Sequence, residues 1–282
     1  MEPQAPIDIK PFFLESPRGR LFSLLLTPSG SAPRGAVLYL HPFAEEMHKS
    51  RRMAALQARA LAARGQVVLQ VDLSGCGDSS GDFVDASWSV WRDDARFAFD
   101  WLAHETGTPI ILWGLRSGAT LAVDLAICLA TSGQPTPQRL LLWQPITSGD
   151  LFLNQFLRIM LAGEMLTGGH AQTGSKALRA QLEAGEPVEV GGNLLSPAMA
   201  RELGSLKLAD MPPPCPVTWF EVSAEAGDHV TPASQRVVDA WRASKTEVAV
   251  HTVQGAPFWN TQEITECPAL LESTLEQMDS PS

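Results

Sequence analysis

The sequence of 282 residues has few of the features that mark disulfide-rich, metal-binding or membrane-spanning proteins. Its four cysteines, Cys76, Cys128, Cys215 and Cys267, lie far apart and form neither a CxxC pair nor a zinc-ligand spacing. The N-terminal segment MEPQAPIDIK has no apolar signal-peptide region, and the longest apolar run, LFLNQFLRIMLAG, is interrupted by polar residues. We therefore expect a cytoplasmic protein with reduced thiols, no metal, no cofactor and no membrane span.

Basic residues are also fewer than acidic residues. The chain has 21 Lys and Arg against 31 Asp and Glu, which gives a net charge of −10. A surface that binds nucleic acid or an anionic membrane needs clustered positive charge, and no basic cluster is visible. We therefore expect no nucleic-acid partner.

Short apolar runs alternate with helical patterns through most of the chain. Six runs rich in Val, Ile and Leu are typical of strands buried on both faces, and they cover residues 36–41, 67–72, 110–114, 140–145, 217–222 and 247–253. Two earlier apolar segments flank the turn-like PRGR and predict an antiparallel hairpin. Alternating strands and helices imply right-handed crossovers. The pattern thus predicts an α/β fold with a mostly parallel, doubly wound sheet and an N-terminal antiparallel hairpin.

The alternation breaks once, after the sixth strand. About seventy residues separate the strand that ends near Pro145 from the one that starts near Pro216, far more than the two to six residues usual for such loops. The segment opens with an amphipathic stretch and continues through Gly-rich sequence. We predict a helical cap over residues 149–210, inserted into a core of residues 1–148 and 211–282, at the edge where open α/β sheets bind ligands.

The stretch ILWGLRSGATLA predicts a strand that turns sharply into a helix. In the nucleophile elbow of hydrolases, small residues stand two positions before and two after the nucleophile because the backbones of strand and helix close on each other. With Gly114 and Gly118 as that pair, Arg116 occupies the nucleophile position. A frame centred on Ser117 would place Leu115 where a small residue is needed, so the register favours Arg116.

Loops after two other strands indicate the same kind of site. In YLHPFAEE, His41 precedes a proline, which leaves Phe43 or Ala44 as backbone N–H donors for an oxyanion hole. VDLSGCGDSSGDF has the tight, glycine-dependent turn expected after the next strand. Unlike a P-loop, it has no Lys-Ser or Lys-Thr end.

The acid and the histidine of a triad should follow the last two strands. Asp228 stands where the acid is expected, but the final loop reads GAPFWN, with Pro257 where a histidine should precede Phe258 and Trp259. His251 lies inside a strand pattern, whereas His229 adjoins Asp228 and is the better substitute base. Arginine cannot lose its proton at ordinary pH and proline has no side-chain proton to exchange, so the Ser-His mechanism has lost two roles.

Together, HPFAEEMHKSRRM, DLSGCGDSSGDF, WGLRSGATLA and GAPFWN resemble the α/β-hydrolase superfamily, and within it the exosortase A system-associated hydrolases of the second type. The resemblance covers nearly the whole chain, and arginine at the elbow is a feature of that group. It implies a nominal ester or thioester hydrolase in exopolysaccharide production and envelope protein sorting. It also implies a paralogous first-type hydrolase as a partner.

Three hypotheses remain open. The first is an anion-binding pseudoenzyme in which Arg116, paired with Asp228, holds a carboxylate, phosphate or acidic glycan group at a helix N-terminus. The residues expected to line that site are His41, Phe43, Ala44, Pro257, Phe258 and Trp259. The second is an active serine hydrolase that uses Ser117 with Asp228 and His229. The third is a protein-interaction module or homo-oligomer whose contact face is the Leu153, Phe156, Leu157 and Met160 stripe of the cap, although such a stripe more often packs on a core.

Overall fold

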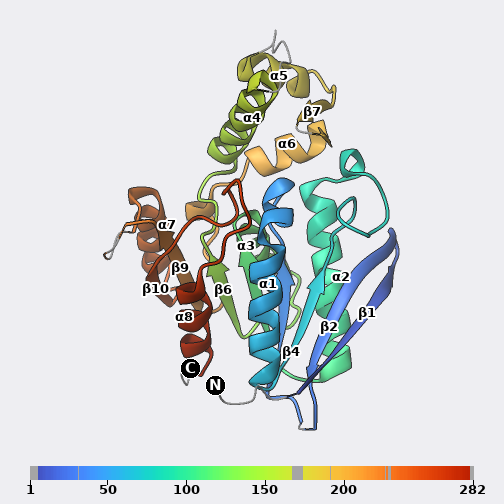
Figure 1. Cartoon of the computed structure of the whole chain (residues 1–282), viewed down its shortest axis with the longest axis vertical. Coiled ribbons are helices and arrows are strands. Elements are labelled where there is room, and N and C mark those ends of the chain that lie inside the picture. The colour runs from blue at the N-terminus through green and yellow to red at the C-terminus, as the bar shows by residue number, and fades with distance from the viewer. Residues whose placement is uncertain are drawn as a thin grey trace.

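The computed structural model describes residues 6–30, 32–166, 174–190, 192–225, 227 and 230–279, apart from the side chains of residues 159–166. An eight-stranded sheet in the order β1-β2-β4-β3-β5-β6-β9-β10 forms its centre (Figure 1). The strands are β1 (Ile7–Ser16), β2 (Gly19–Pro28), β3 (Gly35–Leu40), β4 (Gln66–Val71), β5 (Ile110–Leu115), β6 (Arg139–Trp143), β9 (Val217–Ser223) and β10 (Val248–Gln254).

The predicted topology is confirmed. β1 and β2 form the antiparallel hairpin, β2 is antiparallel to β4, and the remaining pairs are parallel. β3 and β5 are buried along their whole length, because a strand with helices on both faces meets water on neither. In the register, Gly114 of β5 lies between Leu40 of β3 and Leu142 of β6, so the ends of these strands meet at one edge.

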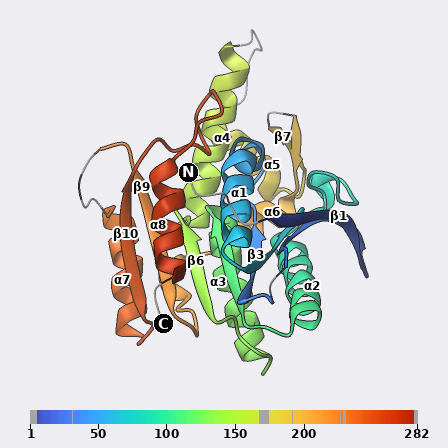
Figure 2. The same ribbon diagram turned by 60° about the horizontal axis from the view of Figure 1, so that its bottom comes forward.

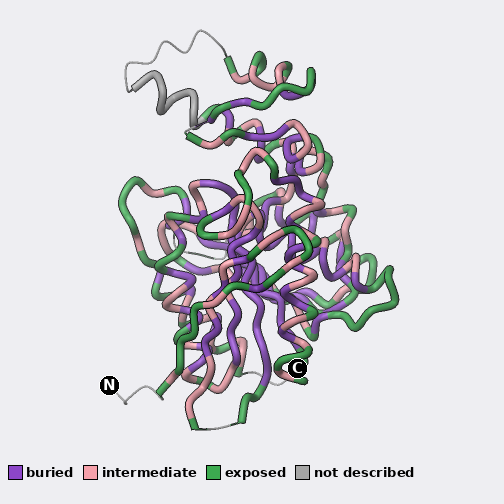
Figure 3. The backbone as a smooth tube through the Cα atoms, turned by 90° about the vertical axis from the view of Figure 1, so that its right-hand side faces the viewer, coloured by how far each residue is buried: buried purple, intermediate pink, exposed green. Residues whose placement is uncertain are grey.

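Helices cover both faces of the sheet. One face carries α1 (Glu45–Ala63) and α8 (Pro268–Asp279), and the other carries α2 (Trp88–Thr106), α3 (Ser117–Thr131) and α7 (Pro232–Ala243) (Figures 1 and 2). α1 begins several residues before the pattern SRRMAALQARALAARG predicted, and its buried residues recur at helical spacing from Met47 to Leu61. In Figure 3 the strands at the centre of the molecule are buried and most connecting loops are exposed, whereas the edge strand β1 is largely exposed.

The segment between β6 and β9 lies beyond the carboxyl ends of the strands (Figure 1). It contains α4 (Gly149–Leu166), α5 (Ser175–Glu183), α6 (Pro197–Gly204) and a short antiparallel pair, β7 (Val188–Val190) with β8 (Asn193–Leu195). The predicted cap is therefore helical with a small hairpin added. Short 3-10 turns at Phe83–Asp85 and Leu208–Asp210 complete the described elements.

The apolar stripe of the cap is mainly packed rather than free. Leu153 and Leu157 are buried, and Phe156 is partly buried against the core. Met160 has no described side chain. Among the described helices, none is both long enough and apolar enough to span a bilayer.

Candidate functional site

The turn between β5 and α3 has the backbone of a nucleophile elbow, with Arg116 at its apex. Arg116 has φ 55° and ψ −117°, a conformation that costs a non-glycine residue about 1–3 kcal/mol. A methyl group on Gly114 would overlap the carbonyl oxygen of Gly118, and one on Gly118 would overlap that of Leu40. The two glycines are thus required by a close approach of three backbone segments, which the frame centred on Arg116 explains.

Ser117 occupies a different environment. It is the first residue of α3 and only 1% exposed, and its Oγ atom is buried without a hydrogen-bond partner among the described residues. A nucleophile must reach a substrate and touch a base. The described surroundings of Ser117 offer neither.

Arg116 projects into a cavity of about 270 Å³ at the carboxyl edge of the sheet, which we call the Arg116 cavity. Its walls come from α1, from the elbow, from α4 and from the loop after β10. The lining residues are Phe43, Glu45, Glu46, Lys49, Arg116, Phe152, Gln155, Phe156, Trp259 and Asn260. The lining thus combines aromatic rings and two carboxamides with two cations, Lys49 and Arg116, and two carboxylates, Glu45 and Glu46. Such a mixture suits an amphipathic organic ligand whose charged end meets Arg116.

The guanidinium is positioned by a carboxylate and two rings. Nε of Arg116 donates to Oε1 of Glu46 at 3.2 Å, and the guanidinium carbon lies 5.4 Å from the ring centre of Trp259 and 5.8 Å from that of Phe152. No hydrogen bond or ion pair joins Nη1 or Nη2 to any described residue. The four N–H groups of Nη1 and Nη2 thus have no partner among the described residues, and their planar fork has the geometry that suits a carboxylate.

Glu46 is the ion-pair partner that the sequence interpretation did not find. Its side chain is 19% exposed, but its Oε2 atom is buried and has no hydrogen-bond partner among the described residues. Burial raises the pKa of the Glu46 carboxyl, while Arg116 and then Lys49 lower it in part. The predicted partner Asp228, and also His229, lie outside the described residues.

Of the six predicted lining residues, the structure brings Phe43 and Trp259 to the Arg116 cavity. Pro257 is exposed, and Phe258 is fully buried against Trp143. Ala44, with φ 46°, is the buried N-cap of α1. These three residues shape the adjoining backbone rather than the cavity wall.

His41 lies in a second space of about 210 Å³ beneath α1, which we call the His41 cavity. Its Nε2 accepts from the Leu73 N–H at 3.1 Å, which leaves Nδ1 to donate to the Pro42 carbonyl at 2.8 Å. Burial lowers the pKa of His41, so the neutral ring fits both bonds. Because backbone groups occupy both nitrogens, His41 supports the loop and offers a ligand nothing. The ring of His251, on β10, stacks on Phe220, and His251 does not line the Arg116 cavity.

The sequence interpretation did not predict seven other residues as lining residues of the Arg116 cavity. They are Glu45, Glu46, Lys49, Phe152, Gln155, Phe156 and Asn260. Glu45 and Glu46 could have been found, because acidic residues that open a helix after a strand favour its N-terminus. Phe152 and Gln155 could not, since only the path of the cap brings α4 to the elbow.

No family model matches the chain, and no curated protein matches its sequence. Solved structures do match its fold. The ferulic acid-bound Est1E from Butyrivibrio proteoclasticus is 15% identical over 95% of this chain and 97% of its own, with a TM-score of 0.65. A thermostable carboxyl esterase from Bacillus coagulans is 16% identical over 97% and 98%, with a TM-score of 0.65. Mouse alpha/beta hydrolase domain-containing protein 10 is 17% identical over 96% and 98%, with a TM-score of 0.62. These likenesses, together with the sheet order and the elbow, show that the chain has the α/β-hydrolase fold.

Proposed function

We propose that this protein binds a small organic anion, a carboxylate above all, on a hydrolase scaffold, and that it does not hydrolyse esters by a Ser-His-Asp mechanism. The observation that carries the proposal is Arg116 at the apex of the elbow, with Nη1 and Nη2 unpaired among the described residues. A guanidinium there meets the ligand where a nucleophile would attack it. The helix N-terminus adds a favourable field for the anion.

The aromatic walls supply the rest of the recognition. Phe43 and Trp259 are buried side chains that form apolar wall, and Phe152 and Phe156 face them from α4. An acyl chain or an aromatic ring fits against these surfaces while the anionic end reaches Arg116. The resemblance to exosortase-associated hydrolases supplies the proposed setting: an acidic glycan or acyl ligand of exopolysaccharide production, a cytoplasmic location and a paralogous hydrolase as partner.

The test compares an anion with its neutral analogue. Isothermal titration with 3-phenylpropionate and with 3-phenylpropionamide should show binding of the carboxylate that is about tenfold tighter or better, as charge-assisted hydrogen bonds contribute. Arg116→Gln should remove that preference and leave the amide affinity unchanged. Arg18→Gln, which alters an exposed pair with Asp93 at the far edge of the sheet, is the control and should bind as the wild type does.

The hydrolase alternative is tested with the same protein. A fluorophosphonate should leave Ser117 unlabelled, and p-nitrophenyl butyrate should not be turned over above the rate of the Ser117→Ala variant. Stoichiometric labelling of Ser117 would overturn the proposal. So would equal affinity for the carboxylate and the amide, or no binding of either.

A further inference from the structure

The pair between Glu46 and Arg116 is asymmetric. One carboxylate oxygen of Glu46 accepts from Arg116 at 3.2 Å, and the other is buried without a partner among the described residues. The other charged residues that line the cavity are Lys49 and Glu45, both on α1. α4 and the loop after β10 contribute only neutral lining residues: Phe152, Gln155, Phe156, Trp259 and Asn260.

A ligand carboxylate at Arg116 would change the balance of charge. It would approach the same guanidinium that neutralises Glu46, so two carboxylates would share one arginine within a partly buried space. Two carboxylates that contact the same guanidinium repel each other, and this repulsion disfavours ionisation of both, as in carboxylate pairs that share one proton. Lys49 alone is the second cation on the wall.

We propose that binding of a carboxylate at Arg116 is coupled to the uptake of one proton by Glu46, so that the cavity takes up its ligand, in net terms, as the neutral acid. The inference rests on the proposed anion-binding function. The proton comes from solvent and resides on Oε2 of Glu46, which has no partner among the described residues. No other bond forms or breaks.

The coupling sets the direction of the pH dependence. In the free protein the pKa of Glu46 is already raised by burial and held down in part by Arg116 and Lys49. A bound anion offsets the stabilisation of the ionised Glu46 carboxylate by Arg116 and Lys49, and thereby raises the pKa of Glu46 further. Affinity must then fall as pH rises from the free-state pKa to the bound-state pKa, by up to about tenfold per pH unit.

The experiment measures affinity and proton uptake together. Isothermal titration with 3-phenylpropionate, between pH 6 and 8 and in two cationic or zwitterionic buffers of different ionisation enthalpy, gives both quantities. The probe stays ionised throughout, because an ordinary carboxyl pKa lies near about 4. The wild type should take up about one proton per ligand inside the window and lose affinity with rising pH.

Glu46→Gln keeps the shape of the side chain and removes the titrating group. We expect it to bind 3-phenylpropionate without that proton uptake and with a nearly flat pH profile. Above the bound-state pKa of Glu46 it should bind about a hundredfold more tightly than the wild type, because uptake of nearly one whole proton corresponds to a change in affinity of that size. Glu266→Gln, which alters an exposed pair with Arg52, is the control and should keep the wild-type profile. Histidine titration contributes equally to all three proteins, so only the difference is assigned to Glu46.

The outcomes separate the two proposals. Binding that depends on Arg116 but shows no proton uptake, or the same uptake in Glu46→Gln, overturns the coupling and leaves the anion site standing. Binding that does not depend on Arg116, or no binding, overturns both.

Discussion

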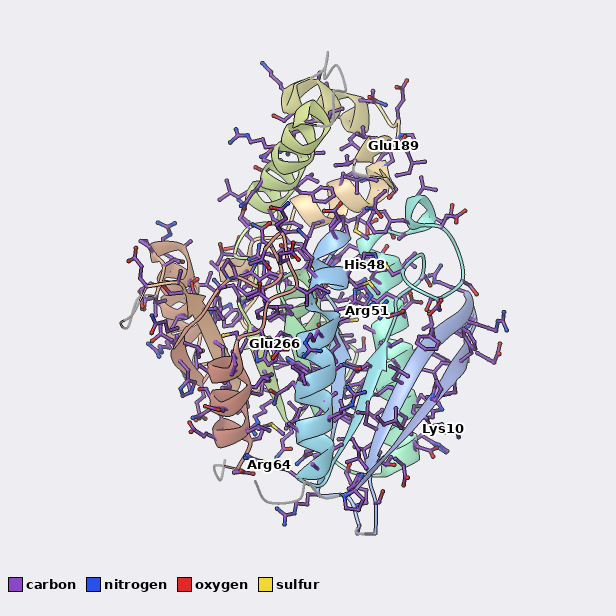
Figure 4. The ribbon with its side chains drawn as sticks, viewed as in Figure 1. Lys10, His48, Arg51, Arg64, Glu189 and Glu266 are labelled. Atoms are coloured by element: carbon purple, nitrogen blue, oxygen red, sulfur yellow. The ribbon has the colours of Figure 1, made fainter. Side chains whose placement is uncertain are left out.

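Among the arginine–carboxylate pairs that involve α1, the pair of Arg51 with Asp72 and the pair of Glu46 with Arg116 differ in how well their carboxylates are supplied with donors. Arg51 donates to Asp72 at 2.9 Å beside the His41 cavity, and Figure 4 shows Arg51 on the side of α1 that faces β4. Asp72 is further tied to its own loop: its carboxylate accepts from the Asp78 N–H, and its carbonyl accepts from the Ser79 hydroxyl. The pair of Glu46 with Arg116 has no such support, since one oxygen of Glu46 is left without a described donor.

The difference is the one we expect between a structural ion pair and the proposed binding site. In the Arg51 pair the buried member, Asp72, has its donors, while Arg51 is 45% exposed and hydrated. In the Arg116 pair both side chains are less than 20% exposed. Oε2 of Glu46 is buried without a described partner, and Nη1 and Nη2 of Arg116 bond to no described residue. Buried polar groups are normally satisfied, and we propose that a proton satisfies Oε2 of Glu46 when a ligand binds.

The largest expected effect comes from a substitution in the elbow, which holds Arg116 and its pair with Glu46 but not the pair of Arg51 with Asp72. Gly118→Ala forces a methyl group onto the carbonyl oxygen of Leu40, so the elbow must shift. We expect a loss of about 3 kcal/mol or more in the free energy of unfolding, together with loss of 3-phenylpropionate binding. Urea unfolding measures the first. Gly174→Ala is the control, because nothing lies within 4 Å of its added methyl; equal stability of both variants would contradict the steric account.

Asp72→Ala should have an intermediate effect on stability and no effect on the affinity for 3-phenylpropionate. It removes a buried acceptor of two hydrogen bonds, but its partner Arg51 can rehydrate, so we expect a loss of about 2 kcal/mol in unfolding free energy. Calorimetric titration should give the wild-type affinity for 3-phenylpropionate. Asp93→Ala, from the exposed pair with Arg18, should change stability by less than about 0.5 kcal/mol. A changed affinity in Asp72→Ala would mean that the two cavities are coupled.

Of the variants in the two pairs, Glu46→Gln should change stability least, within about 1 kcal/mol of the wild type, because the lost ion pair is offset by removal of a buried charge. The sign of its pH dependence is informative. A carboxyl whose pKa is raised on folding makes the folded state bind protons more tightly, so the wild type loses stability as pH rises from the unfolded-state pKa through the raised value. Relative to the wild type, Glu46→Gln should gain stability over that range in urea unfolding. A relative loss with rising pH would show that the charged pair stabilises the fold.

Much of the architecture could be predicted from local pattern. Apolar runs such as IILWG and VVLQV match β5 and β4 within a residue or two, because a strand buried on both faces leaves an uninterrupted apolar signature. The elbow register followed from Gly114 and Gly118 for an equally local reason. The small β7-β8 hairpin of the cap was not predicted, since strands of three residues leave too short a pattern.

The site was less predictable because its partners are distant in sequence. Seventy residues separate Glu46 from Arg116. Their pairing follows from the adjacency of β3 and β5, because α1 and α3, on opposite faces of the sheet, begin just after the ends of these two strands. His41 and Phe43 show the same limit at close range. Only two residues apart, they face different cavities, and no periodicity in HPFAEE distinguishes them.

The sequence by itself determined the kind of scaffold and the position of Arg116 at the apex of the elbow, because both depend on backbone geometry and residue type within a few neighbouring positions. Only the tertiary structure decided what Arg116 meets. The choice of Glu46 as its partner, and the orphaned oxygen that this leaves, depend on which helix N-termini converge at the strand ends and on how much water their packing excludes.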